Sequence, residues 1–244
     1  MARASARQEP ASVDGEVRRA RAEKALETTR RVTELYGPGR WSSKDPLSML
    51  VIIILSQRSK DAETTAGYRA LKERYPTWES MRDAPAAEVE ATIRCVRWPE
   101  LKAPRMQAIM RRITEERGTL SLDFLCELPL EDGVAWLERL EGVGPKTVAC
   151  VLLFSCRKPI LPVDTHVHRI GIRLGLIGQR VSAESAHPLL QAILPPDPQT
   201  LYNFHNGLLL HGQRVCTFER PRCERCPLTD LCDHYQTLVR PAGT

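Results

Sequence analysis

The stretch LERLEGVGPKTVACVLLF, residues 137–154, decides the fold that we expect for this chain. An amphipathic helix runs into the glycine pair at 142–144, and an apolar helix follows from Pro145, which suits a first helical turn. Two glycines around one apolar residue allow a hairpin whose backbone N–H groups point outward. At the positive end of the second helix, these groups can hold a phosphate oxygen. A plain helix–turn–helix corner is the simpler interpretation, but the full string with Lys146 favours the phosphate site.

The rest of the chain has helical patterns almost throughout. Helices are predicted at 17–37, 61–74, 86–95, 102–117 and 131–140, each bounded by proline, glycine or a capping residue. The apolar run at 47–56 is ambiguous, because its isoleucines favour a strand while a fully buried helix has the same pattern. Alternating segments and Asn-Gly hairpins, which mark sheets, are absent from the sequence. We therefore predict an all-α protein in which 47–56 is a buried helix.

Composition indicates an ordinary globular protein of one or two domains, with 42% hydrophobic and 27% charged residues in 244. The net charge of +5 favours an anionic partner only weakly. The polar start MARASARQEP has no signal-peptide pattern, and the apolar run at 49–55 is far shorter than the roughly 20 residues that cross a bilayer. We expect a cytoplasmic, unsecreted protein in which residues 1–16 are a disordered lead-in.

Four cysteines lie close together in CTFERPRCERCPLTDLC, residues 216–232: Cys216, Cys223, Cys226 and Cys232. Clustered cysteines in an unexported protein are more often metal ligands than disulfides. Four thiolates suit either tetrahedral zinc or a [4Fe–4S] cluster, and only one pair has the Cys-x-x-Cys spacing of a zinc knuckle. Both metal centres stay open on spacing alone. The other four cysteines, Cys95, Cys126, Cys150 and Cys156, are expected to be small buried hydrophobic residues.

Three segments together resemble the endonuclease III branch of the helix–hairpin–helix DNA glycosylases: LEGVGPKTVA at 140–149, PVDTHVHRIGIRLGLI at 162–177 and HGQRVCTFERPRCERCPLTDLC at 211–232. The resemblance is specific, because a hairpin lysine, a later aspartate and a four-cysteine tail occur in the family's order. It implies two α-helical domains with DNA in the cleft between them. A six-helix barrel with the hairpin would span 44–158, and an iron–sulfur domain would combine 17–43 with 159–240. The resemblance also favours a structural [4Fe–4S] cluster over zinc.

The resemblance assigns the chemistry to Lys146 and Asp164. The amine of Lys146 would attack C1′ of the sugar and form a Schiff base, which permits β-elimination and strand nicking. Asp164 would stabilise the cationic sugar and assist proton transfers. Taken singly, Lys146 is as well explained as a surface or phosphate-contacting lysine and Asp164 as a helix N-cap. Paired at the family's positions, they predict a bifunctional DNA N-glycosylase and apurinic/apyrimidinic lyase acting on oxidised pyrimidines.

The loop LSQRSKD, residues 55–61, matches the family's segment that fills the gap left by an extruded nucleotide. The arginine-rich loop between the first two cysteines is predicted to contact the DNA backbone. A solvated charged segment, which contains Glu219 and continues to Glu224, explains it equally well. His166 and His168 are spaced for different helix faces, so positioning or phosphate contact is favoured over zinc. The expected DNA-contact residues are Gln57, Arg58, Gly142, Val143, Gly144, Thr147, His166, Arg220 and Arg222.

The chain departs from the family pattern near the expected DNA contacts. Arg58 stands where a neutral amide or small residue is more usual, and Arg97 stands where glycine is usual. Trp98-Pro99 after Arg97 is also unusual, whereas Lys102 and Ala103 match the family. These departures leave the base preference open.

Two other functions compete with this prediction. A monofunctional glycosylase, such as the related adenine glycosylase, lacks the hairpin lysine and carries an extra C-terminal domain, whereas this chain has Lys146 and ends at Thr244. A non-catalytic helix–hairpin–helix DNA-binding module with structural zinc would need no Lys146–Asp164 pair. The expected partner is duplex DNA with damaged bases or abasic sites, without a membrane. The protein is expected to act as a monomer on the nucleoid of a bacterial cytoplasm.

Overall fold

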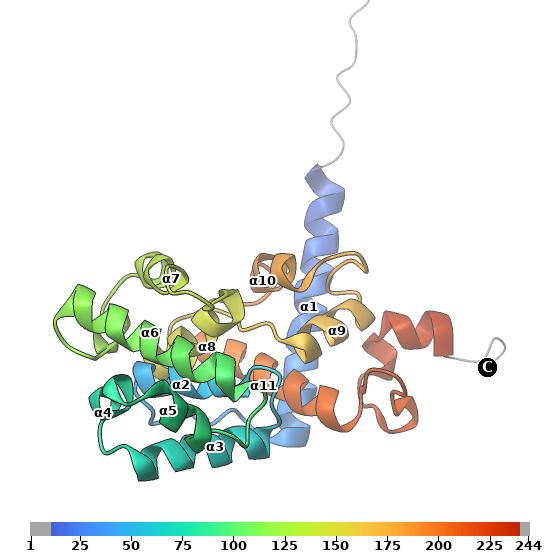
Figure 1. Ribbon diagram of the computed structural model, residues 1–244. Helices are drawn as coiled ribbons and strands as arrows, with labels where there is room; N and C mark the ends of the chain where they lie inside the picture. The colour runs from blue at the N-terminus through green and yellow to red at the C-terminus, as the bar shows by residue number, and fades with distance from the viewer. Residues whose placement is uncertain (1–10, 240–244) are drawn as a thin grey trace, which may run out of the picture. The chain divides into compact units, whose positions relative to one another are not determined.

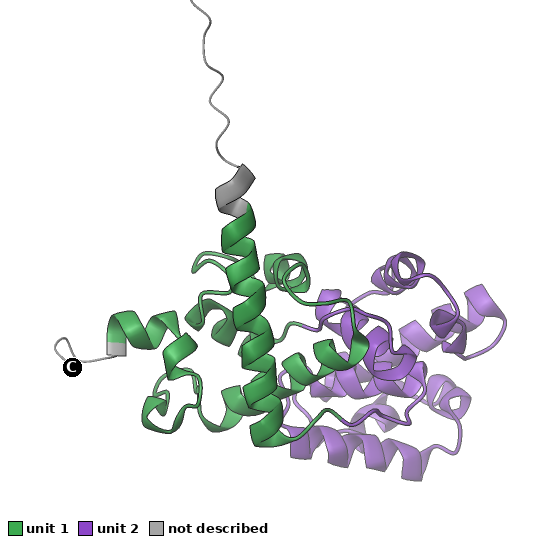
Figure 2. Ribbon diagram, turned by 180° about the vertical axis from the view of Figure 1, so that it is seen from behind, with its two compact units in different colours: residues 1–39, 163–244 green, residues 40–162 purple. Residues whose placement is uncertain are grey.

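The computed structural model describes residues 11–239, and every regular element in that range is helical (Figure 1). This confirms the predicted all-α class. The chain divides into two compact units, one formed by residues 1–39 and 163–244 and the other by 40–162 (Figure 2). The domain boundaries expected from the sequence, 43/44 and 158/159, stand a few residues from these. Within the described residues, no helix is long and apolar enough to cross a membrane.

The N-terminal helix α1 spans Ala11–Tyr36 and begins earlier than predicted. Residues 11–16 are therefore helical rather than disordered, and residues 1–10 lie outside the described part of the chain. The segment is rich in alanine, arginine and glutamate, which favour helices. Ion pairs one turn apart, such as Arg19–Glu23 at 3.0 Å, add support along the exposed face.

The unit at 40–162 contains eight helical elements: α2 (Pro46–Ser56), α3 (Asp61–Arg74), α4 (Trp78–Asp83), α5 (Ala86–Thr92), α6 (Pro99–Arg117), η1 (Asp123–Cys126), α7 (Leu130–Glu138) and α8 (Pro145–Cys156). The apolar run predicted at 47–56 is the buried helix α2. Asp45 caps it by accepting a 2.8 Å hydrogen bond from the Ser48 N–H, and Pro46 occupies its first turn. α2 packs along α8, and Leu50, Ile54 and Val151 are almost completely buried in the core that the two helices share.

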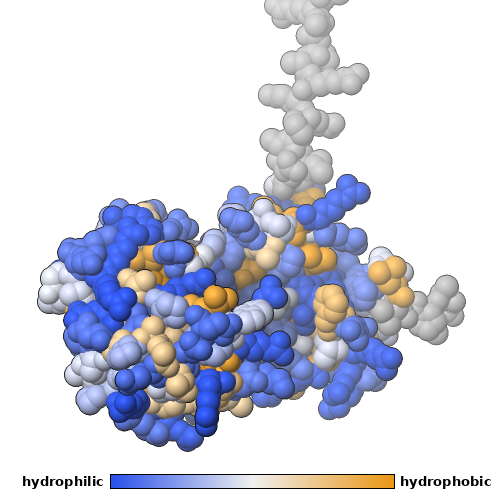
Figure 3. All heavy atoms as spheres, viewed as in Figure 1, coloured by the Kyte–Doolittle hydropathy of each residue, from blue (hydrophilic) through white to orange (hydrophobic). Residues whose placement is uncertain are grey.

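The other unit combines α1 with α9 (Thr165–Arg173), α10 (Ala183–Gln191), α11 (Pro198–Arg214) and the short elements η2 (Cys223–Arg225), η3 (Thr229–Leu231) and η4 (Tyr235–Val239). α11 packs against both α1 and α9. The approach to α1 is close, because a Cβ on Gly207 would overlap the side chain of Val32. Phe204 and Leu208 on the same helix are completely buried. On the face shown in Figure 3 the surface is largely hydrophilic, with scattered apolar residues.

The scattered cysteines correct one expectation. Cys126 and Cys156 form a disulfide between the end of η1 and the end of α8, although their apolar neighbours predicted simple burial. Cys95 is exposed, so among the four only Cys150 is a free buried cysteine as expected. The pairing was missed because it depends on tertiary proximity between residues separated by 30 positions. Such bonds are rare in the reducing compartment that the sequence suggested.

Candidate DNA-binding and catalytic site

The predicted hairpin lies between α7 and α8, with Gly144 as the N-cap of α8. Gly142 has a φ of +77°, and a Cβ there would lie 2.7 Å from the Arg105 side chain, so both its backbone conformation and its packing require glycine. Gly144 has extended backbone and open space around its Cα. No protein atom lies within 4 Å of the position that a Cβ on Gly144 would take. The missing side chain therefore leaves room for another molecule to approach the backbone.

Lys146 is half-buried in the first turn of α8, beside the buried Thr147. The first N–H groups of a helix have no acceptor within it, and the dipole makes this end positive. Val143 anchors the hairpin to the hydrophobic core of its unit: it is 6% exposed, and its N–H donates to the Leu140 carbonyl at 3.1 Å. The structure thus brings together the hairpin residues singled out in the sequence, with donors suited to an anion.

The segment predicted to fill a gap in DNA begins where α2 ends. Lys102, on α6, is only 2% exposed and donates three hydrogen bonds to this segment. Its Nζ lies 2.7 Å from the Leu55 carbonyl oxygen, 2.8 Å from that of Gln57 and 2.9 Å from Oγ of Ser59. Burial lowers the pKa of Lys102 to about 8. The loop is therefore held from inside by a cation, a role that the sequence did not reveal.

Two of the residues that depart from the family pattern, Arg58 and Trp98, lie against each other. The Arg58 guanidinium lies 5.7 Å from the centre of the Trp98 ring, although the two residues are 40 positions apart. They border a cavity of about 370 Å³, which Arg105 connects to Gly142 of the hairpin. The cavity is lined by Gln57, Arg58, Trp98, Leu101, Lys102 and Arg105.

Asp164 is the N-cap of α9, in the other unit. Its Oδ1 accepts 2.8 Å hydrogen bonds from the N–H groups of His166 and Val167. Capping the helix therefore uses only Oδ1 of Asp164, and Oδ2 is left for another role. The half-buried side chain is held in place by these two bonds.

His166 packs inside its unit. A Cβ on Gly212 would lie 2.5 Å from its Nδ1, and that nitrogen accepts a 3.1 Å hydrogen bond from Arg169. Arg169 also donates to the Gly212 and Cys216 carbonyls. His166 thus orients Arg169 beside the cysteine region, and it does not join His168, which contacts the Val181 carbonyl at 2.8 Å.

The four clustered cysteines, Cys216, Cys223, Cys226 and Cys232, line one small cavity of about 20 Å³. All four are free of disulfides. Arg173 donates to Sγ of Cys216 at 3.1 Å, and Nε2 of His211 lies 3.4 Å from Sγ of Cys226. Burial lowers the pKa of His211 to about 4, which keeps the ring neutral, and raises the pKa of the Cys226 thiol to about 11. Metal binding must therefore displace thiol protons here.

Zinc and an iron–sulfur cluster place different demands on the geometry of these cysteines. Zinc would draw its ligands to about 2.3 Å from one ion. Within residues that the structure describes, no three His, Cys, Asp or Glu side chains converge closely enough to hold a single ion. An iron–sulfur cluster, in contrast, is a larger group that four thiolates hold around it.

Arg220 and Arg222 are exposed in the loop between Cys216 and Cys223. The loop backbone is tied down, because Thr217 Oγ1 donates to the Arg220 carbonyl at 2.6 Å and the Arg222 N–H donates to Val215 at 2.9 Å. In the described part of the chain, neither guanidinium forms an ion pair. Exposed cations on a fixed backbone can contact phosphates.

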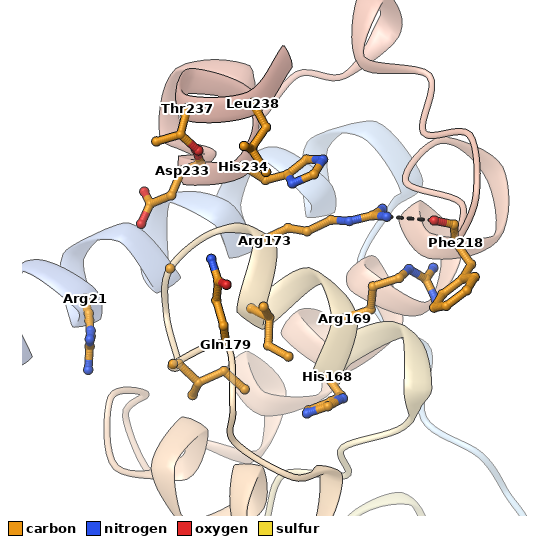
Figure 4. Close-up of a pocket in the computed structure, with 14 residues that line it drawn as sticks. Arg21, His168, Arg169, Arg173, Gln179, Phe218, Asp233, His234, Thr237 and Leu238 are labelled. Carbon is orange, nitrogen blue, oxygen red and sulfur yellow. Dashed lines mark hydrogen bonds between the residues drawn. The ribbon is translucent and has the colours of Figure 1, made fainter. Parts of the chain in front are cut away.

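This unit has a second cavity, of about 730 Å³ (Figure 4). Arg173 extends across it toward the loop and donates to the Phe218 carbonyl at 2.8 Å. Its lining comes from α1, α9, the connection from α9 to α10, the cysteine loop and residues 233–238, so no local sequence signal marks it. Phe218 itself is 76% exposed at the rim.

A glycine hairpin followed by a lysine, and a cavity lined by four cysteines, on an all-helical fold, are the features in which the chain resembles the helix–hairpin–helix DNA glycosylases. Residues 51–196 match the family described as HhH-GPD superfamily base excision DNA repair protein. This chain belongs to that superfamily and, within it, to the endonuclease III family.

Two relatives and one solved structure illustrate the match. Endonuclease III of Thermotoga maritima is 34% identical over 200 residues, covering 82% of this chain and 88% of the relative. The DNA glycosylase/AP lyase ROS1 of Arabidopsis thaliana is 31% identical over 180 residues, covering 68% of this chain but 13% of that protein. A trapped endonuclease III–DNA covalent intermediate shares the fold, with a TM-score of 0.77 and 24% identity, over 90% of this chain and 99% of that one.

Proposed function

We propose that this base-excision glycosylase is bifunctional: it removes oxidised pyrimidines from duplex DNA and then cleaves the resulting abasic site as a lyase. The observation that carries the proposal is Lys146 in the first turn of α8, directly after the hairpin. An amine at this position can reach a sugar whose phosphate is held by the neighbouring backbone donors. One relative bears the name DNA glycosylase/AP lyase, and one structural neighbour is described as a trapped covalent intermediate with DNA.

In the proposed reaction, Nζ of Lys146 bonds to C1′ as the bond from C1′ to the base breaks. The base leaves with the bonding electrons and is protonated. After the nitrogen gives up one proton, its lone pair opens the sugar ring, O4′ takes up a proton, and a protonated Schiff base forms. This cation acidifies the C2′ protons and allows the 3′ phosphate to leave by β-elimination. Asp164 stabilises the positive charge that develops on the sugar. Its Oδ2 does so, because Oδ1 is already engaged by two backbone N–H groups.

We further propose that Cys216, Cys223, Cys226 and Cys232 hold a [4Fe–4S] cluster. Four free thiols that line one cavity, in a chain of the endonuclease III family, support it over zinc. The cluster would supply structural rigidity to the loop that carries Arg220 and Arg222, rather than chemistry at the sugar. Together with Gln57 and the hairpin donors, these two arginines would contact DNA.

We place the enzyme, as a monomer, on the nucleoid of a bacterial cytoplasm.

The experiment that tests the activity is covalent trapping. Incubation with a duplex containing thymine glycol and sodium borohydride should reduce the Schiff base and leave a permanent protein–DNA band. Lys146→Gln should abolish the band and strand nicking while DNA binding remains. Lys72→Gln, which removes an amine on α3 that stacks on Trp78, serves as the matched control and should trap normally.

Other outcomes of the trapping experiment would assign a different function or a different nucleophile. Base release without trapping would assign a monofunctional glycosylase, and binding without release across several lesions would assign a non-catalytic module. Trapping that survives in Lys146→Gln would show that another amine is the nucleophile.

A further inference from the structure

His211 lies in the last turn of α11 and is only 1% exposed. Both of its ring nitrogens have a partner from a different part of the unit. Nδ1 lies 3.1 Å from Oη of Tyr36, the last residue of α1, and Nε2 lies 3.4 Å from Sγ of Cys226. The three side chains therefore form one continuous chain of polar groups, which begins on α1 and ends at the cysteine cavity.

The direction of the hydrogen bonds in this chain depends on the tautomer of the ring. Burial favours the neutral imidazole, which has one N–H donor and one acceptor nitrogen. A free thiol at Cys226 can donate to Nε2, but a thiolate bonded to iron has only lone pairs to offer. Once Cys226 is a ligand, Nε2 must therefore carry the proton, and Nδ1 accepts a hydrogen bond from the Tyr36 hydroxyl.

The hydroxyl of Tyr36 is suited to this role. Burial raises the pKa of Tyr36 above its ordinary value, so the hydroxyl keeps its proton and can donate. The Arg214 guanidinium lies 5.5 Å from the centre of the tyrosine ring, and that ring lies 6.1 Å from the ring of His211. Hydrogen bonds in series polarise one another, so a donor to Nδ1 strengthens the donor at Nε2.

We propose that His211, held in this tautomer by Tyr36, is a positioning residue for the Cys226 ligand of the [4Fe–4S] cluster, and that its Nε2–H···Sγ hydrogen bond raises the reduction potential of the cluster. The inference rests on the cluster proposed above. Hydrogen bonds to the sulfur ligands stabilise the added negative charge of the reduced state, which is how a protein tunes such a centre.

This contact can be tested separately from the loop that surrounds the cavity. Arg173 also donates to a cysteine, Sγ of Cys216, but it is charged and holds two loop carbonyls as well. His211 is a neutral donor on a helix, so its replacement leaves the net charge as it was. Its backbone carbonyl accepts from the N–H groups of Val215 and Cys216, and these bonds do not depend on the side chain.

The test measures the reduction potential of the cluster in the whole protein by voltammetry. His211→Leu removes the donor and keeps an apolar side chain in the buried position. We expect the equilibrium between the oxidised and reduced cluster to shift about tenfold toward the oxidised state, as for one hydrogen bond to a charged group. For a one-electron couple, this corresponds to a potential about 59 mV lower. His211→Gln keeps an N–H donor and should lie closer to wild type than His211→Leu.

A second variant and a control complete the design. Tyr36→Phe keeps the aromatic ring but removes the hydroxyl, so the potential should fall in the same direction and by less than in His211→Leu. His205→Leu is the matched control, because this histidine is 4% exposed on the same helix and does not line the cysteine cavity. It should leave the potential unchanged. Iron analysis of every variant shows whether its cluster is complete.

A potential equal to that of wild type in His211→Leu, with four irons per chain, would overturn the hydrogen bond and leave the cluster standing. Equal shifts in His205→Leu and His211→Leu would overturn it as well, because the loss of any buried histidine would then have the same effect. If His211→Leu assembles no cluster, Tyr36→Phe decides, and an unchanged potential there refutes the proposal. One zinc and no iron in the wild-type protein would refute both the cluster and its tuning.

Discussion

Lys102 donates a 2.8 Å hydrogen bond to the carbonyl oxygen of Gln57, so that a buried ammonium supports the backbone of the loop expected to enter DNA. The same group has two further acceptors, and together they use all three of its donors. A short loop with few apolar contacts would otherwise be mobile. We expect this cation to determine how well the loop is pre-organised.

Replacing Lys102 by methionine should lower the free energy of unfolding by about 1–3 kcal/mol, because the Leu55 and Gln57 carbonyls lose their buried donor. Binding to a duplex with an abasic analogue should weaken more than binding to undamaged duplex. Urea denaturation and fluorescence anisotropy measure the two effects. Lys44→Met, which removes a lysine that stacks on Tyr68, should change neither. A Lys102→Met protein with wild-type stability and affinity would contradict this role.

The lowered pKa of Lys102, about 8, predicts a pH dependence of stability. In the unfolded chain the amine keeps its proton up to its ordinary value near 10.5, so between pH 8 and 10.5 the unfolded state binds more protons. The contribution of this residue to the free energy of unfolding should therefore increase as the pH rises through that window. Denaturation at pH 7.5 and pH 9.5 should show wild type gaining stability relative to Lys102→Met. A constant difference would show that the pKa is unshifted.

The disulfide between Cys126 and Cys156 closes a loop across 30 positions of sequence. On the chain-entropy account, a loop of this size contributes about 3–4 kcal/mol. The double variant Cys126→Ser with Cys156→Ser should unfold at correspondingly lower urea, and reduced wild-type protein should match it. Cys95→Ser, at the exposed cysteine, is the control. If mass spectrometry of the native protein found two free thiols at 126 and 156, the bond would be absent in solution.

The cysteine cavity predicts the colour and metal content of the purified protein. It should be yellow-brown, with broad visible absorbance and about four irons per chain. Cys226→Ser should lose the iron and fold poorly, because a vacant site leaves the C-terminal loop without its organising centre. Metal analysis that found one zinc and no iron per chain would show that the four cysteines hold zinc and not a [4Fe–4S] cluster.

The exposed arginines of the cysteine loop predict a salt effect. Replacing Arg220 and Arg222 together by alanine should weaken binding to all duplexes alike. It should also reduce the slope of log affinity against log salt by roughly 0.9 for each DNA phosphate that the variant no longer neutralises. Arg69→Ala, on α3, removes an exposed arginine that pairs with Glu73 and should leave the slope as it was. An unchanged slope in the double variant would mean that the loop is merely solvated.

The local signals in the sequence were sufficient for most helices and for the hairpin. The isoleucine run could be assigned to a buried helix because no strand partner was evident, and Asp45 and Pro46 do start a helix there. The N-terminal helix begins at Ala11 rather than at 17, because alanine and arginine favour a helix in the segment that was expected to be disordered.

What the sequence could not reveal are contacts between distant positions. Arg58 and Trp98 were each recognised as unusual, but no local pattern places one against the other. The three acceptors of Lys102 and the partner of Cys126 are hidden for the same reason. Such pairs arise from how the helices pack, so they require the fold itself.

The bond between Cys126 and Cys156 makes residues 126–156 a covalent ring, and α7, the hairpin and α8 all lie inside it. A protease that cuts one peptide bond within the ring therefore cannot release a fragment, because the two pieces stay linked through sulfur. The nicked chain would keep the hairpin tethered to its unit, and it would separate into two bands in gel electrophoresis only after reduction.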